Sequence, residues 1–414
     1  MVWCPSDATG RTTLIRSLER ASGDRPRVAL FATHPIQYQV PWFQALAARQ
    51  DVALKVYFGQ VPDAAQQGVG FGVDFHWDIP MLEGYESEVL ENVASPPSLG
   101  TFDGSDTPHV GRNLHQWKPD LAILTGWQSK MLVQAWWACV RLGVPRIVRG
   151  ESNAMPHRAP WKRMLHRVWL RGFDRFLAIG RANREFYRQA GIPASRIHPC
   201  PYFVDNRRFA AAASALREGR MELRAKWSIP EAATCFLFCG KLIPKKHPLD
   251  LLRALQRAVA AGARAHVLIV GDGELMAETR ALVTRERLPA TFAGFLNQSE
   301  IVGAYVAGDC LVLPSDTGET WGLVVNEAMA CGLPAIVSDQ VGCGPDLVSE
   351  GVTGATFPMG DVDALAQRLI EFAGDGARLR AMGTAACERV SSSYSVERAT
   401  EGTLAAIDAT MARG

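Results

Sequence analysis

Two glutamates in the second half of the chain have a spacing that suits ligand binding. Glu319 and Glu327 lie in the string SDTGETWGLVVNEAMACGLPAIVSD, which reads as a strand end, a loop and a helix from about Gly322. Seven residues separate the two carboxylates, close to two turns at about 3.6 residues per turn, so both can face one ligand. Gly322 permits close backbone approach at the helix N-terminus, where free N–H groups favour an anion such as phosphate.

The alternative interpretation of this pair is structural, with Glu319 capping the helix and Glu327 as a solvated surface charge. Glu327 argues against it, because its neighbours in the helix are mostly apolar and the helix reads as buried. Charged residues are seldom buried without a partner.

Two lysines follow an earlier apolar strand in the string CFLFCGKLIPKKHPLDLLRAL. Lys241 and Lys246 flank the loop and can both reach a diphosphate, which supplies the positive charge that a metal-free leaving-group site needs. Solvated loop charges are the other interpretation. The position of the lysines favours the first, because both lie at a strand's carboxyl end and face the cleft of Glu319 if the two strands share a sheet.

Short apolar strands alternate with helices along both halves of the chain. The strands read RVALFATH, VALKVYF, PDLAILTG, PRIVRG and RFLAIG, and later CFLFCGKL, AHVLIVGDG, ATFAGFL, CLVLPSD and PAIVSD. This alternation predicts parallel sheets with helices on both faces. We therefore predict an α/β fold of two doubly wound, Rossmann-like domains facing a central cleft, where ligands of open α/β sheets bind.

The length of 414 residues suits two or three domains. A Pro, a turn-prone Asp-Asn pair and an Ala-rich polar run mark the crossing between them. The last segment places Leu404, Ile407 and Met411 on one helical stripe, which predicts a terminal helix that packs back on the core. The predicted parts are a polar leader at 1–26, an N-terminal acceptor-side domain at 27–205, the crossing at 206–229, a C-terminal nucleotide-binding domain at 230–390 and the terminal helix at 391–414.

Composition excludes several classes of protein. Lys and Arg number 44 against 42 Asp and Glu, so no bulk field would recruit nucleic acid. The nine cysteines show no zinc spacing. The Asp361 and Asp363 pair could suggest a metal, but it opens a polar helix and is interpreted as an N-cap with a first-turn acid, so we expect no metal. Neither a signal peptide's apolar run nor a spanning helix is found, which predicts a cytoplasmic protein.

The motifs of the second half resemble those of a large family, the retaining nucleotide-sugar glycosyltransferases of family 4. GKLIPKKH is similar to its phosphate loop, VGDGEL to its glycine turn, GETWGLVVNEAMACGLPAIVSD to its E-x7-E motif and GCGPDLVSEGVTGATFP to a later glycine-rich run. PYFVDNRRF is similar to the family's crossing segment. The resemblance implies the GT-B fold and a nucleotide diphosphate sugar as donor, with no cofactor.

The resemblance also assigns residues. Glu319 would hold hydroxyls of the donor sugar at the catalytic centre, and Glu327 would bind the ribose of the nucleotide. Lys241 and Lys246 would neutralise the diphosphate. The remaining donor contacts would come from a base site at Gly294 and Phe295 and from the backbone of Thr320, Trp321, Gly322 and Leu323.

The first half departs from the family at two strand ends. Many members have a Gly-rich turn after the first strand, where this chain has ATHPIQYQ with His34. The family often ends a later strand with a histidine near the reacting sugar, and PRIVRGES places Glu151 there. We predict that both residues are catalytic; for His34, a histidine that caps local backbone is equally open, whereas a strand-end carboxylate in the cleft has little structural purpose.

Residues 157–188 carry nine Lys or Arg against two Asp or Glu. The repeated cations and the neighbouring apolar stripe are Arg163, Arg167, Arg171 and Arg175, beside Trp161, Leu165, Val168 and Trp169. An anionic membrane surface is one partner that this pattern suits. The other interpretation is an exposed basic face whose apolar stripe packs on the sheet. The family's frequent use of lipid-linked acceptors favours the membrane, on its inner face.

We therefore predict a retaining, metal-independent glycosyltransferase that acts on a glycan or lipid-linked acceptor in cell-envelope, surface polysaccharide or glycolipid synthesis. A leaving phosphate oxygen can accept the acceptor's proton, so no protein nucleophile is needed. The alternatives are a nucleotide-sugar epimerase or phosphorylase on the same fold, and a catalytically silent nucleotide-sugar-binding partner protein.

Overall fold

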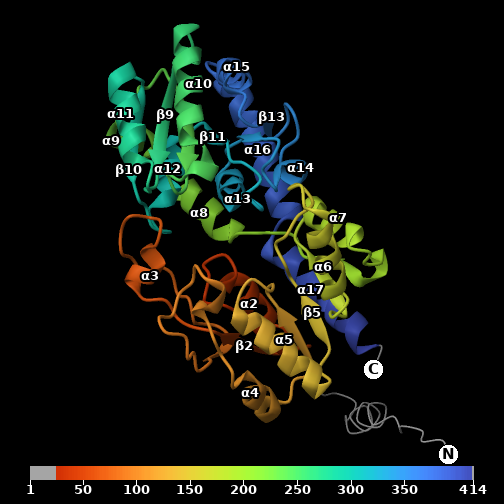
Figure 1. Ribbon diagram of the computed structural model, residues 1–414. Helices are drawn as coiled ribbons and strands as arrows, with labels where there is room; N and C mark the ends of the chain where they lie inside the picture. The colour runs from red at the N-terminus through yellow and green to blue at the C-terminus, as the bar shows by residue number, and fades with distance from the viewer. Residues whose placement is uncertain (1–24, 413–414) are drawn as a thin grey trace, which may run out of the picture.

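The computed structural model describes residues 25–412, so nearly all of the polar leader expected at 1–26 lies outside the described residues. The described chain forms two halves, one above the other in Figure 1, and each half is built on one parallel sheet. The sheet of the first half has the order β3-β2-β1-β4-β5-β6-β7, and that of the second half has the order β10-β9-β8-β11-β12-β13. The predicted α/β fold with two Rossmann-like sheets is confirmed.

The strands are short, and several are buried at every residue, as strands covered on both faces must be. In the first half they are β1 (Arg27–Ala32), β2 (Ala53–Phe58), β3 (Glu86–Val89), β4 (Leu121–Leu124), β5 (Arg146–Val148), β6 (Arg175–Ala178) and β7 (Ile197–Pro199). In the second half they are β8 (Thr234–Cys239), β9 (Ala265–Val270), β10 (Ala290–Gly294), β11 (Cys310–Leu313), β12 (Ala335–Ser338) and β13 (Gly354–Phe357).

Helices follow most strands and cover the sheets. The first half contains α2 (Val40–Ala47), α3 (Ala64–Gly68), α4 (Val110–Trp117), α5 (Lys130–Leu142), α6 (Pro160–Leu170) and α7 (Arg181–Gln189). The later helices are α8 (Asn206–Leu216), α9 (Arg220–Lys226), α10 (Pro248–Ala260), α11 (Met276–Glu286), α12 (Ile301–Ala307), α13 (Leu323–Ala330), α14 (Gly344–Leu347), α15 (Val362–Phe372), α16 (Gly376–Ser393) and α17 (Val396–Met411). None of the helices in the described part is both long and apolar enough to cross a bilayer.

The segment expected to be a crossing, 206–229, forms the helices α8 and α9, which pack on α12 and α13 of the second half. A buried Val204 and Phe209 join the same core as α12. The Asp205 side chain accepts a hydrogen bond from the Arg208 N–H and so caps α8. The coil before α8 therefore carries the chain from one half to the other.

The C-terminal helix α17 returns to the first half, along which it runs in Figure 1. Its predicted stripe is confirmed, because Ile407 is buried in the core on one face of the first sheet, and Leu404 and Met411 pack against that core. The Trp42 indole N–H of α2 donates a 3.2 Å hydrogen bond to the Thr403 hydroxyl. The last helix thus packs on the first half, while α16, which precedes it in the chain, packs on α13 of the second half.

The carboxyl ends of the strands lie at one edge of each sheet, because the strands within each sheet run parallel. His34 follows β1, Glu151 follows β5, Lys241 follows β8 and Phe295 follows β10. The two edges meet, since side chains of each half reach the backbone of the other. The predicted functional residues therefore gather where the halves face each other.

Candidate functional site

Glu319 and Lys246 form an ion pair beside the N-terminus of α13. Lys246 ends the 3₁₀ turn Pro244–Lys246 after β8, and Glu319 lies in the loop after β11. The two strands are neighbours in the sheet, as the prediction for the lysines requires. Both side chains are mostly buried, with 12% and 13% exposed. A cation and a carboxylate are thus held together beside the N-terminus of a helix.

Gly322 fixes the entry to α13. Its φ of 99° lies in the left-handed region that favours glycine. A Cβ atom at this position would lie 2.8 Å from the side chain of Leu313. The loop can therefore bring its backbone N–H groups close to a ligand at the start of the helix.

Lys241 lies under a segment of the first half, residues 69–78, which we call the strap. Its Nζ atom donates a 2.8 Å hydrogen bond to the Val69 carbonyl oxygen and lies 4.2 Å from the ring centroid of Phe71. Burial and the charges of Lys245 and Lys246 lower the pKa of Lys241. One of the two predicted phosphate ligands is therefore covered by the strap in this structure.

The strap also covers the expected base site. The ring centroids of Phe71 and Phe75 lie 5.4 and 4.3 Å from that of Phe295, which follows Gly294 at the end of β10. The Asn297 amide donates a 2.7 Å hydrogen bond to the His76 carbonyl oxygen. The sequence pattern predicts none of these contacts, although the string GVGFGVDFHW combines glycines and aromatic residues and could have indicated a binding segment.

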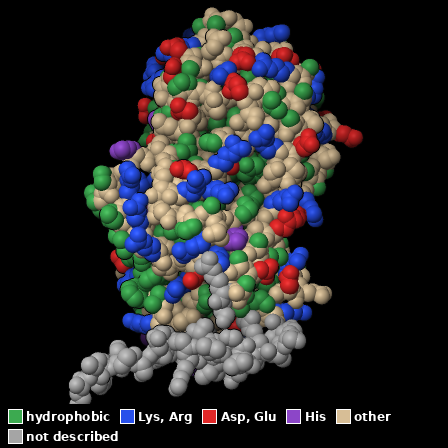
Figure 2. All heavy atoms as spheres, turned by 90° about the vertical axis from the view of Figure 1, so that its right-hand side faces the viewer, with side chains coloured by type: hydrophobic (Ala, Val, Ile, Leu, Met, Phe, Trp, Pro, Cys, Tyr) green, Lys and Arg blue, Asp and Glu red, His purple; other side chains and the backbone are tan. Residues whose placement is uncertain are grey.

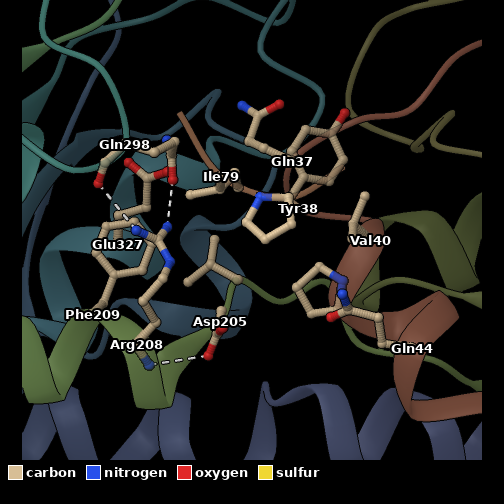
Figure 3. A pocket seen from close by; sticks show the side chains of 13 residues that line it. Gln37, Tyr38, Val40, Gln44, Ile79, Asp205, Arg208, Phe209, Gln298 and Glu327 are labelled. Carbon is tan, nitrogen blue, oxygen red and sulfur yellow. Dashed lines mark hydrogen bonds between the residues drawn. The ribbon is translucent and has the colours of Figure 1, made fainter. Parts of the chain in front are cut away.

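Glu327 opens into a cavity of about 180 Å³ between the halves (Figure 3). Its carboxylate is 8% exposed and accepts a 2.6 Å hydrogen bond from the Tyr305 hydroxyl. Burial raises the pKa of Glu327, while the hydroxyl of Tyr305 and the charge of Arg208 oppose that rise. Figure 3 shows the guanidinium of Arg208 beside Glu327, held by the backbone and side-chain oxygens of Gln298.

Glu327 is thus buried and partnered, and the alternative of a solvated surface charge is wrong. The polar groups that line the cavity with it belong to Gln37, Tyr38, Gln44, Asp205, Arg208 and Gln298. Glu319, Lys241 and Lys246 are not among the lining residues. That one ligand spans both glutamates stays a prediction.

Glu151 accepts a hydrogen bond from the Tyr202 hydroxyl at the meeting of the two halves. The ring of Tyr202 is stacked on Trp321, with centroids 5.6 Å apart. Two residues beyond Glu151, the Asn153 amide donates a 2.9 Å hydrogen bond to the Thr320 carbonyl oxygen. The strand end of Glu151 therefore touches the loop that leads from Glu319 through Gly322 into α13, which begins at Leu323.

His34 has a local partner. Its Nδ1 atom lies 2.9 Å from the Thr33 hydroxyl oxygen, so the contact is with a neighbouring side chain rather than with the backbone. Burial lowers the pKa of His34 to about 4, and the imidazole is therefore neutral near pH 7. Its catalytic role stays a prediction.

The helix α6 leaves its apolar stripe exposed. The apolar side chains that are more than half exposed on it are Trp161 (64%), Met164 (59%), Leu165 (60%) and Val168 (58%). The neighbouring cations Lys162, Arg163, Arg167 and Arg171 are exposed as well. Figure 2 views the side of the molecule on which α6 lies in Figure 1 and shows Lys and Arg side chains beside hydrophobic ones.

Two details of the expected basic ridge are corrected. Arg175 lies in β6, is 3% exposed and donates to the Ala409 carbonyl oxygen of α17, so it is not part of the ridge. Trp169 is partly buried against Trp136 and Phe173. The interpretation in which the whole stripe packs on the sheet is wrong, because Trp161, Leu165 and Val168 are exposed.

Two family models match the chain. The model of the glycosyl transferases group 1 matches residues 219–389, and that of the glycosyl transferase 4-like domain matches residues 76–202. A solved structure of Anabaena Alr3699/HepE, in complex with UDP and glucose, superposes with a TM-score of 0.66 over 93% of this chain and 100% of that one, at 18% identity. This likeness shows the GT-B fold.

Curated relatives are similar over part of their length. The GDP-mannose-dependent alpha-mannosyltransferase of Mycobacterium tuberculosis is 35% identical over 239 residues, which are 55% of this chain and 57% of the relative. The GDP-mannose-dependent monoacylated alpha-(1-6)-phosphatidylinositol monomannoside mannosyltransferase of Corynebacterium glutamicum is 31% identical over 203 residues, 48% of this chain and 52% of the relative. The chain thus matches little more than half the length of these relatives.

Proposed function

Because this chain belongs to glycosyltransferase family 4, the glycosyl transferases group 1, we propose that it transfers a sugar from a nucleotide diphosphate donor to an acceptor hydroxyl. The observation that carries the proposal is the pair of Lys246 and Glu319 at the N-terminus of α13. A cation, a carboxylate and free helix N–H groups lie together there. These are the groups that a phosphate leaving group and a sugar's hydroxyls require.

The reaction breaks the bond between the sugar's anomeric carbon and the β-phosphate oxygen. Negative charge then grows on the diphosphate, and Lys246, Lys241 and the N-terminus of α13 stabilise it. The sugar passes through an oxocarbenium-like state, whose positive charge the carboxylate of Glu151 stabilises from the first half. Preorganised charges of this kind lower a barrier because they need no rearrangement during the reaction.

The acceptor hydroxyl attacks the same face that the diphosphate leaves, and its proton moves to the departing phosphate oxygen. The new glycosidic bond forms as the proton is transferred, so the anomeric configuration is retained without a protein nucleophile. Glu319 binds hydroxyls of the donor sugar, and Glu327 binds the ribose from the side of the cavity in Figure 3. The lysines take the place that a metal ion has in other nucleotide-sugar sites.

The acceptor in this proposal is a glycan or a lipid-linked saccharide of the cell envelope. Two curated relatives are mannosyltransferases, and one of them is named for a phosphatidylinositol mannoside. Exposed apolar side chains beside exposed cations on α6 support a site that works at an anionic bilayer. Each cation near such a surface contributes about 1 kcal/mol at low salt.

Turnover of a donor panel tests the proposal. The purified protein is incubated with GDP-mannose, UDP-glucose and related donors, with and without membrane extract as acceptor, and release of the nucleoside diphosphate is measured. We expect release that the acceptor stimulates, and a product whose anomeric proton shows the donor's configuration by NMR. Donor binding without any release would instead support the silent partner protein, an isomerised donor would support the epimerase, and a strict need for phosphate would support the phosphorylase.

A further inference from the structure

Arg149 is a cation buried inside the first half, with 1% of its surface exposed. Three aromatic rings surround its guanidinium: the Cζ atom lies 5.3 Å from the ring centroid of Trp42, 4.6 Å from that of Tyr202 and 5.7 Å from that of Phe203. Among residues 25–412, none of its three side-chain nitrogens has a partner in hydrogen-bond geometry. Arg149 is therefore a buried charge that is packed among ring faces, with Cys200 and Glu151 also close enough to interact with it.

Such an arrangement costs stability. A guanidinium keeps its proton in proteins, so burial cannot neutralise it. Replacing a buried charge by an apolar side chain of similar volume is often neutral or stabilising. A buried polar group without hydrogen bonds therefore calls for an explanation outside packing, and a functional role is one such explanation.

The neighbours of Arg149 lead to the functional site. The ring of Tyr202, which faces the guanidinium, carries the hydroxyl that donates to Glu151. Burial and the negative charge of Glu151 hold the pKa of Tyr202 well above its ordinary value, so the hydroxyl stays a donor. A cation over a phenol ring withdraws electron density and strengthens that donor. The charges of Arg149 and Glu151 also attract each other directly.

We propose that Arg149 is a positioning residue for the transfer reaction, acting through Tyr202 to hold the carboxylate of Glu151 in one place beside the reacting sugar. Arg149 itself touches no substrate. With one carboxylate oxygen bound by Tyr202, the carboxylate keeps a fixed position from which its charge stabilises the positive charge that develops on the sugar. The inference rests on the proposed function, because it needs a reaction in which that charge appears.

The test is the substitution Arg149→Met, which keeps the length of the side chain and removes its charge. Donor turnover, donor KM and Tm are measured on the full chain. We expect a Tm equal to or above that of the wild type, an unchanged KM and a kcat lower by about tenfold or more, which corresponds to the loss of one charge-assisted interaction. Tyr202→Phe should lower kcat to a similar extent, and the double variant should be little slower than either single one.

Arg196→Met provides the matched control. Arg196 also lies over an aromatic ring, 5.4 Å from the centroid of Phe176, but it donates hydrogen bonds to the carbonyl oxygens of Phe173 and Asp174. It precedes β7, at the end of the sheet away from the cleft. We expect this variant to lose Tm and to keep the kcat of the folded enzyme.

Three outcomes would overturn the inference. An Arg149→Met protein that does not fold, or whose Tm falls as that of Arg196→Met does, assigns Arg149 to structure. A kcat within twofold of the wild type removes its link to the reaction. If the wild type turns over no donor, the proposed function itself has failed. If the wild type and the Arg149 variant are equally active, the proposed function stands and only the role of Arg149 has failed.

Discussion

The ammonium group of Lys246 lies against the carboxylate of Glu319, although the two residues are far apart in the chain. Each neutralises the charge of the other in this contact. On the proposed function, a diphosphate that binds Lys246 would release Glu319 to accept hydrogen bonds from the sugar's hydroxyls. Binding of the diphosphate and binding of the sugar would thus be coupled through the ion pair of Lys246 and Glu319.

Glu319→Gln and Glu327→Gln should each lower donor turnover by about a hundredfold or more, because each removes a charge from the donor's immediate surroundings. Each substitution keeps the size of the side chain and leaves a polar amide beside the existing partner, Lys246 or Tyr305, so the Tm should change by only a few degrees. Steady-state release of nucleoside diphosphate and thermal unfolding measure both effects. Glu300→Gln, an exposed glutamate before α12, is the control and should be indistinguishable from the wild type. Near-normal activity of both site variants would refute the assignment.

Lys241→Ala combined with Lys246→Ala should weaken binding of a nucleoside diphosphate at least tenfold and leave binding of the nucleoside nearly unchanged. The reason is that, on the proposed function, both cations neutralise the diphosphate and contact neither the base nor the ribose. Isothermal titration calorimetry with GDP or UDP, and with the matching nucleoside, gives the two losses. Equal losses for both ligands would contradict the phosphate role. Turnover should also survive a chelator in the wild type, and a strict need for divalent metal would count against the metal-independent reaction.

Phe75→Ala should tighten binding of the nucleoside diphosphate several-fold. In this structure the strap packs Phe75 on Phe295 and bonds Val69 to Lys241. The nucleotide must displace these contacts, and its apparent affinity is reduced by the fraction of molecules in which the strap is docked. Phe102→Ala, a half-exposed phenylalanine elsewhere in the first half, is the control. Weaker binding in the Phe75 variant would mean that this ring contacts the nucleotide instead of excluding it.

His34→Gln should flatten the pH dependence of stability between pH 6.5 and about 4. The folded protein holds the pKa of His34 near 4 by burial, so the unfolded chain binds a proton in this range and the folded one does not. Stability is therefore full above pH 6.5 and falls as the pH drops toward 4, by up to about 3 kcal/mol from this residue. Urea unfolding at several pH values tests it. A slope unchanged in the variant would show that His34 protonates freely in the folded state.

Charge reversal on α6, with Arg163→Glu and Arg167→Glu, should abolish co-sedimentation with anionic vesicles at low salt. Wild-type binding should weaken as salt is raised, because screening shortens the reach of the cations. Arg112→Glu with Arg264→Glu changes the net charge equally at exposed sites outside α6 and should bind normally. If the wild type stays in the supernatant with anionic vesicles, α6 is a docking face for another protein and the lipid-linked acceptor loses its support.

The sequence was sufficient for the features that depend on local pattern. Alternating apolar strands predict both sheets, and the buried neighbours of Glu327 predict its burial. The strap could not be predicted, because the contacts of Phe75 with Phe295 join residues more than 200 positions apart. The surroundings of Arg149 could not be predicted either. It directly follows β5, and nothing in the local sequence indicates that three aromatic rings enclose it. The spacing of one arginine at every fourth residue predicted Arg175 on the helix. That prediction failed because α6 ends at Leu170 and Arg175 begins β6.

If α6 rests on a bilayer, as proposed, its place in the chain also limits where the chemistry takes place. Glu151 precedes the first residue of α6, Pro160, by nine positions, and an extended chain spans at most about 3.5 Å per residue. With α6 resting on a bilayer, the reacting sugar is therefore within about 30 Å of that surface, roughly the thickness of the hydrocarbon core itself. A lipid-linked acceptor would then have to present its reacting hydroxyl within that distance of the surface while its lipid tail stays in the membrane.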